Sequence, residues 1–250
     1  MLTVSDSAKK VSILVPTALL PRPLRVKSRE QLLSRLEVAI ARRAGLLIIG
    51  HPKSGNTWLK VMLARLYQVR HGFNASELIG SDELALRNPA IPRLAATNAV
   101  YSYEGAVGRI LASGAPDDPL RHKPVMLLAR NPIDIAVSWF FQFTKRQSAH
   151  KQELINHFID HPIDRHTVGM WDFVRHSDIG LPFLIDYLNT WEHNIAELDN
   201  ACIIRYEDLR SDTADTLKKI TALMAVSYTH LRAHETMTGI AYAVFCLKRG

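Results

Sequence analysis

Residues 46–58, LLIIGHPKSGNTW, join an apolar strand to a glycine-containing loop and the start of a helix. The glycines and the threonine keep the spacing of the ATPase loop G-x-x-x-x-G-K-[ST], whose backbone N–H groups surround phosphates. Asn56 occupies the position of the ATPase lysine, however, and the cation is Lys53. A helix N-terminus after such a loop binds anions. The stretch therefore predicts a phosphate site without the γ-phosphate clamp and Mg²⁺ arrangement of ATPases.

The composition suits one globular domain with an anionic ligand. The chain has 250 residues, of which 47% are hydrophobic, enough for a full core. Its net charge of +7 favours an anionic ligand or partner. No arginine-rich block is interleaved with aromatic residues, so we do not expect a nucleic-acid partner. The two cysteines, Cys202 and Cys246, show neither metal-ligand spacing nor a disulfide framework, which favours a reducing compartment.

The N-terminal residues partly imitate a signal peptide. Two lysines precede the apolar run VSILVPTALL, but Pro16 interrupts that run, which is also too short to span a bilayer. We therefore expect a cytoplasmic protein without stable membrane insertion. Three prolines within residues 1–27 predict an irregular lead-in.

Apolar runs and helical periodicity alternate along the rest of the chain. Strands are predicted at 46–50, 125–129 and 201–205. Helices are predicted at 28–43, 57–69 and 133–145, and two more begin at Pro182 and after a capping Asp212. Residues 72–124 and 147–180 are predicted to be mostly loops. Strands separated by helices favour an α/β fold, a three-layer sandwich with a central parallel sheet like that of P-loop NTPases. We expect one domain, residues 28–226, with its ligand at the carboxyl ends of the strands.

Three motifs together resemble one enzyme family. They are HPKSGNTW at 51–58, ARNPIDIAVSWFFQF at 129–143 and RYEDLRSD at 205–212. In order, spacing and flanking strands they are similar to the sulfotransferases that use 3′-phosphoadenosine 5′-phosphosulfate (PAPS). The resemblance covers about residues 44–225. It implies PAPS as the co-substrate and, because PAPS has no triphosphate, no metal.

The resemblance also implies a donor site with two anion-binding parts. Arg130 offers a planar fork to the 3′-phosphate, and Ser138 can donate its hydroxyl to the same group. Lys53 can reach the bridging oxygen between sulfate and phosphate, where it would stabilise the departing charge. Tyr206 and Trp58 are similar to family residues that contact the adenine. The loop backbone completes the expected donor site, at Ser54, Gly55, Asn56 and Thr57.

The expected catalytic base departs from the family pattern. Many relatives carry a Thr-His pair upstream of the second motif, whereas this chain has Thr97-Asn98. Asparagine can orient an acceptor, but it cannot deprotonate one in the useful pH range. Glu104 is the nearest alternative base. Asn98 and Glu104 are therefore the candidate catalytic residues beside Lys53.

The C-terminal residues also depart from the pattern. The family continues to an Arg-Lys-Gly loop over the 3′-phosphate, of which residues 227–250 hold no copy. SYTHLRAHET resembles translated adapter sequence, so we expect this tail to be non-native and the domain to be truncated at its C-terminus. His230 and His234 lie four residues apart, but on this interpretation they form no metal site.

Sulfuryl transfer to a hydroxyl or amine of a small molecule, lipid or carbohydrate is the function that these features favour. Two alternatives remain: a nucleotide-binding module without turnover, which Asn98 would explain, and a nucleoside or nucleotide kinase, against which Asn56 argues. The sequence indicates neither the acceptor nor the oligomeric state.

Overall fold

A four-stranded parallel sheet forms the centre of the molecule. The computed structural model describes residues 6–74, 80–112 and 116–224. The sheet order is β2-β1-β3-β4, and the strands are β1 (Leu46–Ile49), β2 (Leu94–Thr97), β3 (Val125–Ala129) and β4 (Ala201–Arg205). Pairs β1–β2, β1–β3 and β3–β4 are all parallel. The predicted α/β fold with a parallel sheet is thus confirmed.

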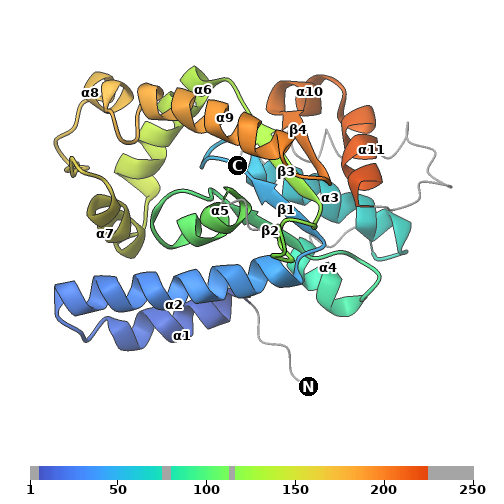
Figure 1. Ribbon diagram of the computed structural model, residues 1–250, viewed down its shortest axis with the longest axis horizontal. Coiled ribbons are helices and arrows are strands. Elements are labelled where there is room, and N and C mark those ends of the chain that lie inside the picture. Colours follow the sequence, from blue (N-terminus) through green and yellow to red (C-terminus); the bar gives the residue numbers. More distant parts are fainter. Residues whose placement is uncertain (1–5, 75–79, 113–115, 225–250) are drawn as a thin grey trace.

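Helices cover both faces of this sheet (Figure 1). Every residue of β1 is buried, as expected for a strand covered on two sides. Leu46 and Ile48 pack with residues of α3 (Asn56–Arg70), α4 (Ser81–Arg87) and α11 (Thr213–Leu223). Leu47 and Ile49 pack on the other face with residues of α2 (Arg22–Arg43), α5 (Gly105–Ala112) and α9 (Leu181–Ala196). The alternation of side chains along β1 therefore produces three layers.

The prediction of an irregular lead-in at residues 1–27 was wrong within the described part. Residues Asp6–Thr17 form α1, and α2 begins at Arg22 rather than after Ser28. Pro16 lies in the last turn of α1, and Pro23 lies in the first turn of α2. In the first turn of a helix the backbone N–H groups have no intrahelical partner, so a proline there removes no hydrogen bond. The prolines delimit two helices instead of preventing them.

Further elements were not predicted either. Strand β2 is short, with the sequence LAAT, and lies within a region expected to be loops. Residues 147–180, also expected to be irregular, contain α7 (Ala149–Phe158) and α8 (Met170–Arg175). The helix predicted at 133–145 is divided into α6 (Pro132–Phe141) and a π-helical turn, η2 (Gln142–Arg146). The predicted Asp212 cap is confirmed, because its side chain accepts a hydrogen bond from the N–H of Asp215 at 3.2 Å.

The carboxyl ends of the strands bring distant segments together. The loop after β1 leads into α3, and β2 is followed by the short 3₁₀ helix η1 (Ser102–Glu104). Strand β3 leads into α6, and β4 leads directly into α10 (Tyr206–Ser211). No helix among the described residues is long and apolar enough to cross a membrane.

Candidate functional site

A cavity of about 640 Å³ lies at this edge of the sheet. Residues that follow all four strands line it, together with residues of α6, η2 and α7. Ten of the eleven predicted site residues line this cavity: Lys53, Gly55, Asn56, Thr57, Trp58, Asn98, Glu104, Arg130, Ser138 and Tyr206. The eleventh, Ser54, is fully buried behind the loop. The structure therefore brings the three sequence motifs and the segment after β2 to one place.

The glycine loop is held in a compact conformation. Gly55 has φ +110°, and a Cβ atom there would lie 2.6 Å from the ring of Tyr206. Both the backbone conformation and the space therefore require glycine. Lys53 also has a positive φ, 80°. The side-chain amide of Asn56 donates to the carbonyl of Gly50 at 3.1 Å, so it ties the two ends of the loop together.

Arg130 connects all three motifs. Its Nη1 donates to the carbonyl of Lys53 at 3.0 Å, and its guanidinium lies over the ring of Tyr206. Asp134, one turn along α6, approaches Nη2 at 3.5 Å. Among the described residues, Arg130 Nε and Ser54 Oγ are buried without a hydrogen-bond partner. Buried donors normally have partners, and because Arg130 lines the cavity, its Nε fits a wall that receives an anion.

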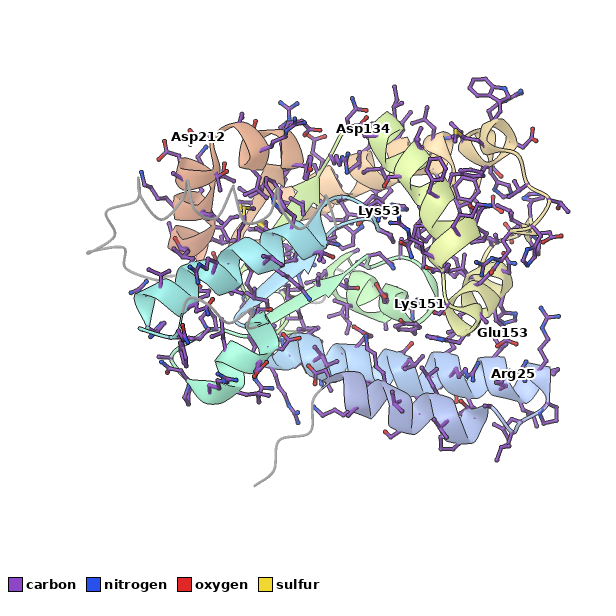
Figure 2. All side chains as sticks on the ribbon, turned by 180° about the vertical axis from the view of Figure 1, so that it is seen from behind. Arg25, Lys53, Asp134, Lys151, Glu153 and Asp212 are labelled. Atoms are coloured by element: carbon purple, nitrogen blue, oxygen red, sulfur yellow. The ribbon has the colours of Figure 1, made fainter. Side chains whose placement is uncertain are left out.

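The charges around Lys53 also suit an anion. Burial lowers the pKa of the Lys53 ammonium below its usual value, and the positive charges of Arg146 and Arg130 lower it further. No carboxylate in the described part of the chain forms an ion pair with Lys53, which Figure 2 shows in the loop near the centre of the molecule. A ligand with several negative charges would compensate this local excess of positive charge.

Two aromatic rings lie beside the glycine loop. Trp58 is at the start of α3 and Tyr206 is at the start of α10, and their ring centroids are 5.4 Å apart at an interplanar angle of 56°. Both rings line the cavity, as does Ser138 of α6. The arrangement offers aromatic surface beside the loop and a hydroxyl at a separate place in the cavity wall.

Asn98 has a structural role that the sequence did not reveal. Its side-chain oxygen accepts hydrogen bonds from the N–H groups of Val100 and Tyr101, at 3.0 and 2.8 Å. Its own N–H donates to Glu104 Oε2 at 2.8 Å. Asn98 thus holds the turn that follows β2. Glu104 lines the cavity, and its hydrogen bond from Asn98 engages only Oε2.

His51 was not selected from the sequence, although it lies within the first motif. It is completely buried, which lowers the pKa of its imidazole to about 3. Its Nδ1 lies 2.8 Å from the carbonyl of Pro52, which can only accept, so Nδ1 carries the proton. Nε2 then accepts from the hydroxyl of Tyr101 at 2.9 Å. His51 therefore joins the loop after β1 to the turn after β2.

Much of the remaining cavity wall comes from residues outside the predicted site, of which Trp139 and Gln142 belong to the second motif. It includes Ser102, Tyr103, Trp139, Gln142, Gln147, Lys151, Leu154 and Ile155. Residues of α7 were missed for two reasons. Their segment was predicted to be a loop, and no sequence signal indicates that it packs over the ends of strands distant in the sequence. Among the described residues, no group of three or more His, Cys, Asp or Glu side chains could hold a metal ion.

Comparison with known proteins gives one family. The family described as "Sulfotransferase domain" matches residues 44–241, a range that extends beyond the described residues. Cytosolic sulfotransferase 14 and 15 of Arabidopsis thaliana are 26% and 27% identical to this chain, each over 77% of its length. Sulfotransferase 2A6 of Rattus norvegicus is 25% identical over 72%. The chain spans 54–59% of the length of these relatives. No solved structure gave a significant match.

Proposed function

The chain belongs to the sulfotransferase domain family, and we propose from this that it transfers a sulfuryl group from PAPS to a hydroxyl or amine acceptor. The observation that carries the proposal is the meeting of Lys53, Arg130 and Ser138 in one cavity. Two phosphate-binding parts and an aromatic surface match the two anionic ends and the adenine of this donor.

We assign the two ends of the donor to different residues. The 3′-phosphate binds at Arg130, whose partnerless Nε is available as a donor, and at the hydroxyl of Ser138. The 5′-phosphosulfate binds at the loop from Lys53 to Thr57, whose backbone N–H groups open helix α3. Trp58 and Tyr206 contact the adenine. This assignment explains why the buried Nε of a partly exposed guanidinium group lacks a partner.

The proposed reaction is a direct displacement at sulfur. The acceptor oxygen or nitrogen forms a bond to sulfur while the bond between sulfur and the bridging phosphate oxygen breaks. The departing 3′-phosphoadenosine 5′-phosphate (PAP) takes the electron pair, and the ammonium of Lys53 stabilises the charge that develops there. The acceptor proton passes to Glu104, since Asn98 uses its side-chain oxygen to hold backbone N–H groups. Lys53 and Glu104 are thus the proposed catalytic residues, and Asn98 positions Glu104.

The donor requires no metal in this scheme, because it lacks the β- and γ-phosphates that Mg²⁺ bridges in kinases. A nucleoside or nucleotide kinase therefore fits less well: residue 56 is an asparagine tied to Gly50 rather than a phosphate-binding lysine. A nucleotide-binding module without turnover shares the same donor site and differs only in the fate of the sulfate. The names of the Arabidopsis relatives support a cytoplasmic location, which we also propose.

Calorimetric titration of the full chain tests the donor assignment. We expect PAP to bind without Mg²⁺ and more tightly than AMP, which lacks the 3′-phosphate. Tighter binding of ATP with Mg²⁺ than of PAP would indicate a kinase instead. Binding of PAP without sulfate transfer to any hydroxyl or amine would indicate the module without turnover.

A further inference from the structure

We propose that the acceptor end of the cavity is built for a small aromatic hydroxyl compound that carries a carboxylate, with Lys151 as the residue that selects the negative charge. This inference rests on the proposed function, because it names the class of acceptor for that reaction. Three observations support it: two buried polar groups without partners, one lysine without an ion pair, and the aromatic residues of the cavity wall.

The two partnerless polar groups are Ser102 Oγ and Trp139 Nε1. Both atoms are buried without a hydrogen-bond partner among the described residues, and both residues line the cavity. Ser102 is 6% exposed and Trp139 is 1% exposed. Buried donors left without partners are rare in folded proteins. They are therefore well suited to bind an oxygen atom of the acceptor.

The backbone near Ser102 has an unusual conformation. Ser102 has φ 49° and Ala99 has φ 60°, values that residues other than glycine seldom adopt. Asn98 and His51 hold this turn through the hydrogen bonds described above. Backbone strain of this kind is concentrated at functional sites. Here it accompanies a partnerless hydroxyl at the cavity wall.

Lys151 supplies a positive charge at the same wall. It lies on α7, is exposed, and forms no ion pair with the described residues. Its charge also acts on Glu37, but that carboxylate is paired with Lys10 at 2.5 Å. In Figure 2, Lys53 lies above Lys151 and the Glu153–Arg25 pair lies below it. A negatively charged ligand in the cavity is the partner that this lysine lacks.

The position of α7 is fixed from outside the cavity. Glu153 accepts hydrogen bonds from Nε and Nη2 of Arg25, at 3.2 and 2.6 Å, and from Nη1 of Arg29 at 3.1 Å. Such bidentate pairs restrain orientation as well as distance. The same helix then presents Lys151, Leu154 and Ile155 to the cavity. Lys151 therefore lies on a helix whose position is fixed by its ion pairs with α2.

The rest of the wall indicates a small aromatic molecule. Tyr101, Tyr103 and Trp139 line it together with Leu154 and Ile155. Aromatic side chains pack well against the faces or edges of a ligand ring. The whole cavity is about 640 Å³, within the range of roughly 300–1,000 Å³ that one drug-sized ligand occupies. Because PAPS must share it, the room left suits an acceptor of one ring rather than a lipid or a long carbohydrate.

Binding of para-hydroxyphenylacetate and of its neutral methyl ester tests the proposal directly. Both are titrated into the full chain, with and without saturating PAP. We expect the acid to bind about fivefold more tightly than the ester, the effect of one partly exposed ion pair. In Lys151→Met this ratio should fall to about one. Lys145→Met is the matched control, because Lys145 is exposed and is not part of the cavity wall.

Each outcome decides one claim. Equal binding of acid and ester by the unmodified chain, or a preference that survives in Lys151→Met, would overturn the proposal. Ser102→Ala should weaken the binding of both compounds equally, by about fivefold. Unchanged affinity in this variant would show that Ser102 is not part of the acceptor site. If the acid is preferred but PAP does not bind, the proposed function fails while the carboxylate site stands.

Discussion

The guanidinium of Arg130 lies over the ring of Tyr206, with its Cζ atom 4.4 Å from the ring centroid. These residues follow β3 and β4, and the same guanidinium also donates to the carbonyl of Lys53 in the loop after β1. One side chain therefore links the ends of three neighbouring strands. Because the cation is already held by a ring and a carbonyl, it loses little freedom when an anion binds.

The first prediction concerns the 3′-phosphate. Arg130→Ala removes a charge-assisted hydrogen bond, typically worth about 1.5–3 kcal/mol, so PAP binding should weaken by about tenfold or more. Affinity for AMP should change far less. Calorimetry with both ligands measures this difference, and Arg210→Ala, an exposed arginine of α10, serves as the control. Equal losses for the two ligands would show that Arg130 only supports the loop.

The second prediction concerns Lys53. In the proposed reaction its charge stabilises an oxygen whose negative charge develops, so Lys53→Met should lower kcat by about a hundredfold or more. Donor binding should fall only modestly. Steady-state rates and PAP titration separate the two effects. A variant that retains most of its turnover would limit Lys53 to packing of the loop.

The third prediction concerns proton removal. Glu104→Gln keeps an oxygen for the N–H of Asn98 but removes the basic carboxylate. Rates with an alkyl alcohol should fall about a hundredfold or more, the usual size of general-base assistance. A phenol with a pKa of about 7 arrives partly ionised, so its rate should fall much less. Equal rates for variant and parent on the alcohol would exclude Glu104 as the base.

Asn98→His provides the complementary experiment. A histidine would restore the family's usual base, but it would also remove the oxygen that accepts from Val100 and Tyr101. We therefore expect the variant to lose stability by about 1 kcal/mol or more, measured by denaturant unfolding. A stable variant with faster alcohol sulfation would contradict the positioning role of Asn98.

The fourth prediction concerns pH. The pKa of His51 is about 3 in the folded protein, against about 6.5 in an unfolded chain. Between these values the unfolded state binds more protons, so stability falls as the pH falls from about 6.5 towards 3. His51 should therefore lower the free energy of unfolding at pH 5 by about 2 kcal/mol relative to pH 7.

Denaturant unfolding at pH 7 and pH 5 measures this loss, and His51→Gln should reduce it. Nuclear magnetic resonance of the unmodified protein gives a second readout. The imidazole of His51 should remain neutral at pH 5. A protonated His51 at that pH would refute the buried, neutral tautomer that accepts from Tyr101.

The fifth prediction concerns residues 227–250, which lie outside the described residues. Within the described part of the chain, the four strands and the helices that cover them end by Leu223. If the tail is non-native, its deletion should leave both the melting temperature and PAP affinity unchanged. The family match continues to residue 241, so loss of folding or of binding on deletion would show that the segment belongs to the domain.

The sequence was most informative where function depends on local spacing. The loop from Gly50 to Trp58 and the helix after it follow from glycine positions and apolar periodicity, both of which are local properties. Strand β2 was missed because four small or apolar residues within a loop-rich stretch carry little signal. Its place beside β1 is decided by packing against β1 and not by its own propensity.

The acceptor side could not be predicted in the same way. Helix α7 reaches the cavity because Glu153 pairs with Arg25, 128 residues away in the sequence. Asn98 illustrates a different limit. Its alignment with a catalytic histidine predicted an acceptor-binding role, but only the structure shows that its oxygen holds two backbone N–H groups. Long-range pairing and side-chain orientation are not encoded in residue spacing.

Transfer of radioactive sulfate from labelled PAPS is the decisive test of the proposed sulfuryl transfer. The full chain is incubated with labelled PAPS and a panel of phenols, alcohols and amines, with Lys53→Met as the control. We expect label to move to at least one acceptor, with one PAP released for each sulfate transferred and little transfer by the variant. Tight PAP binding with no label in any acceptor would contradict the proposed sulfuryl transfer.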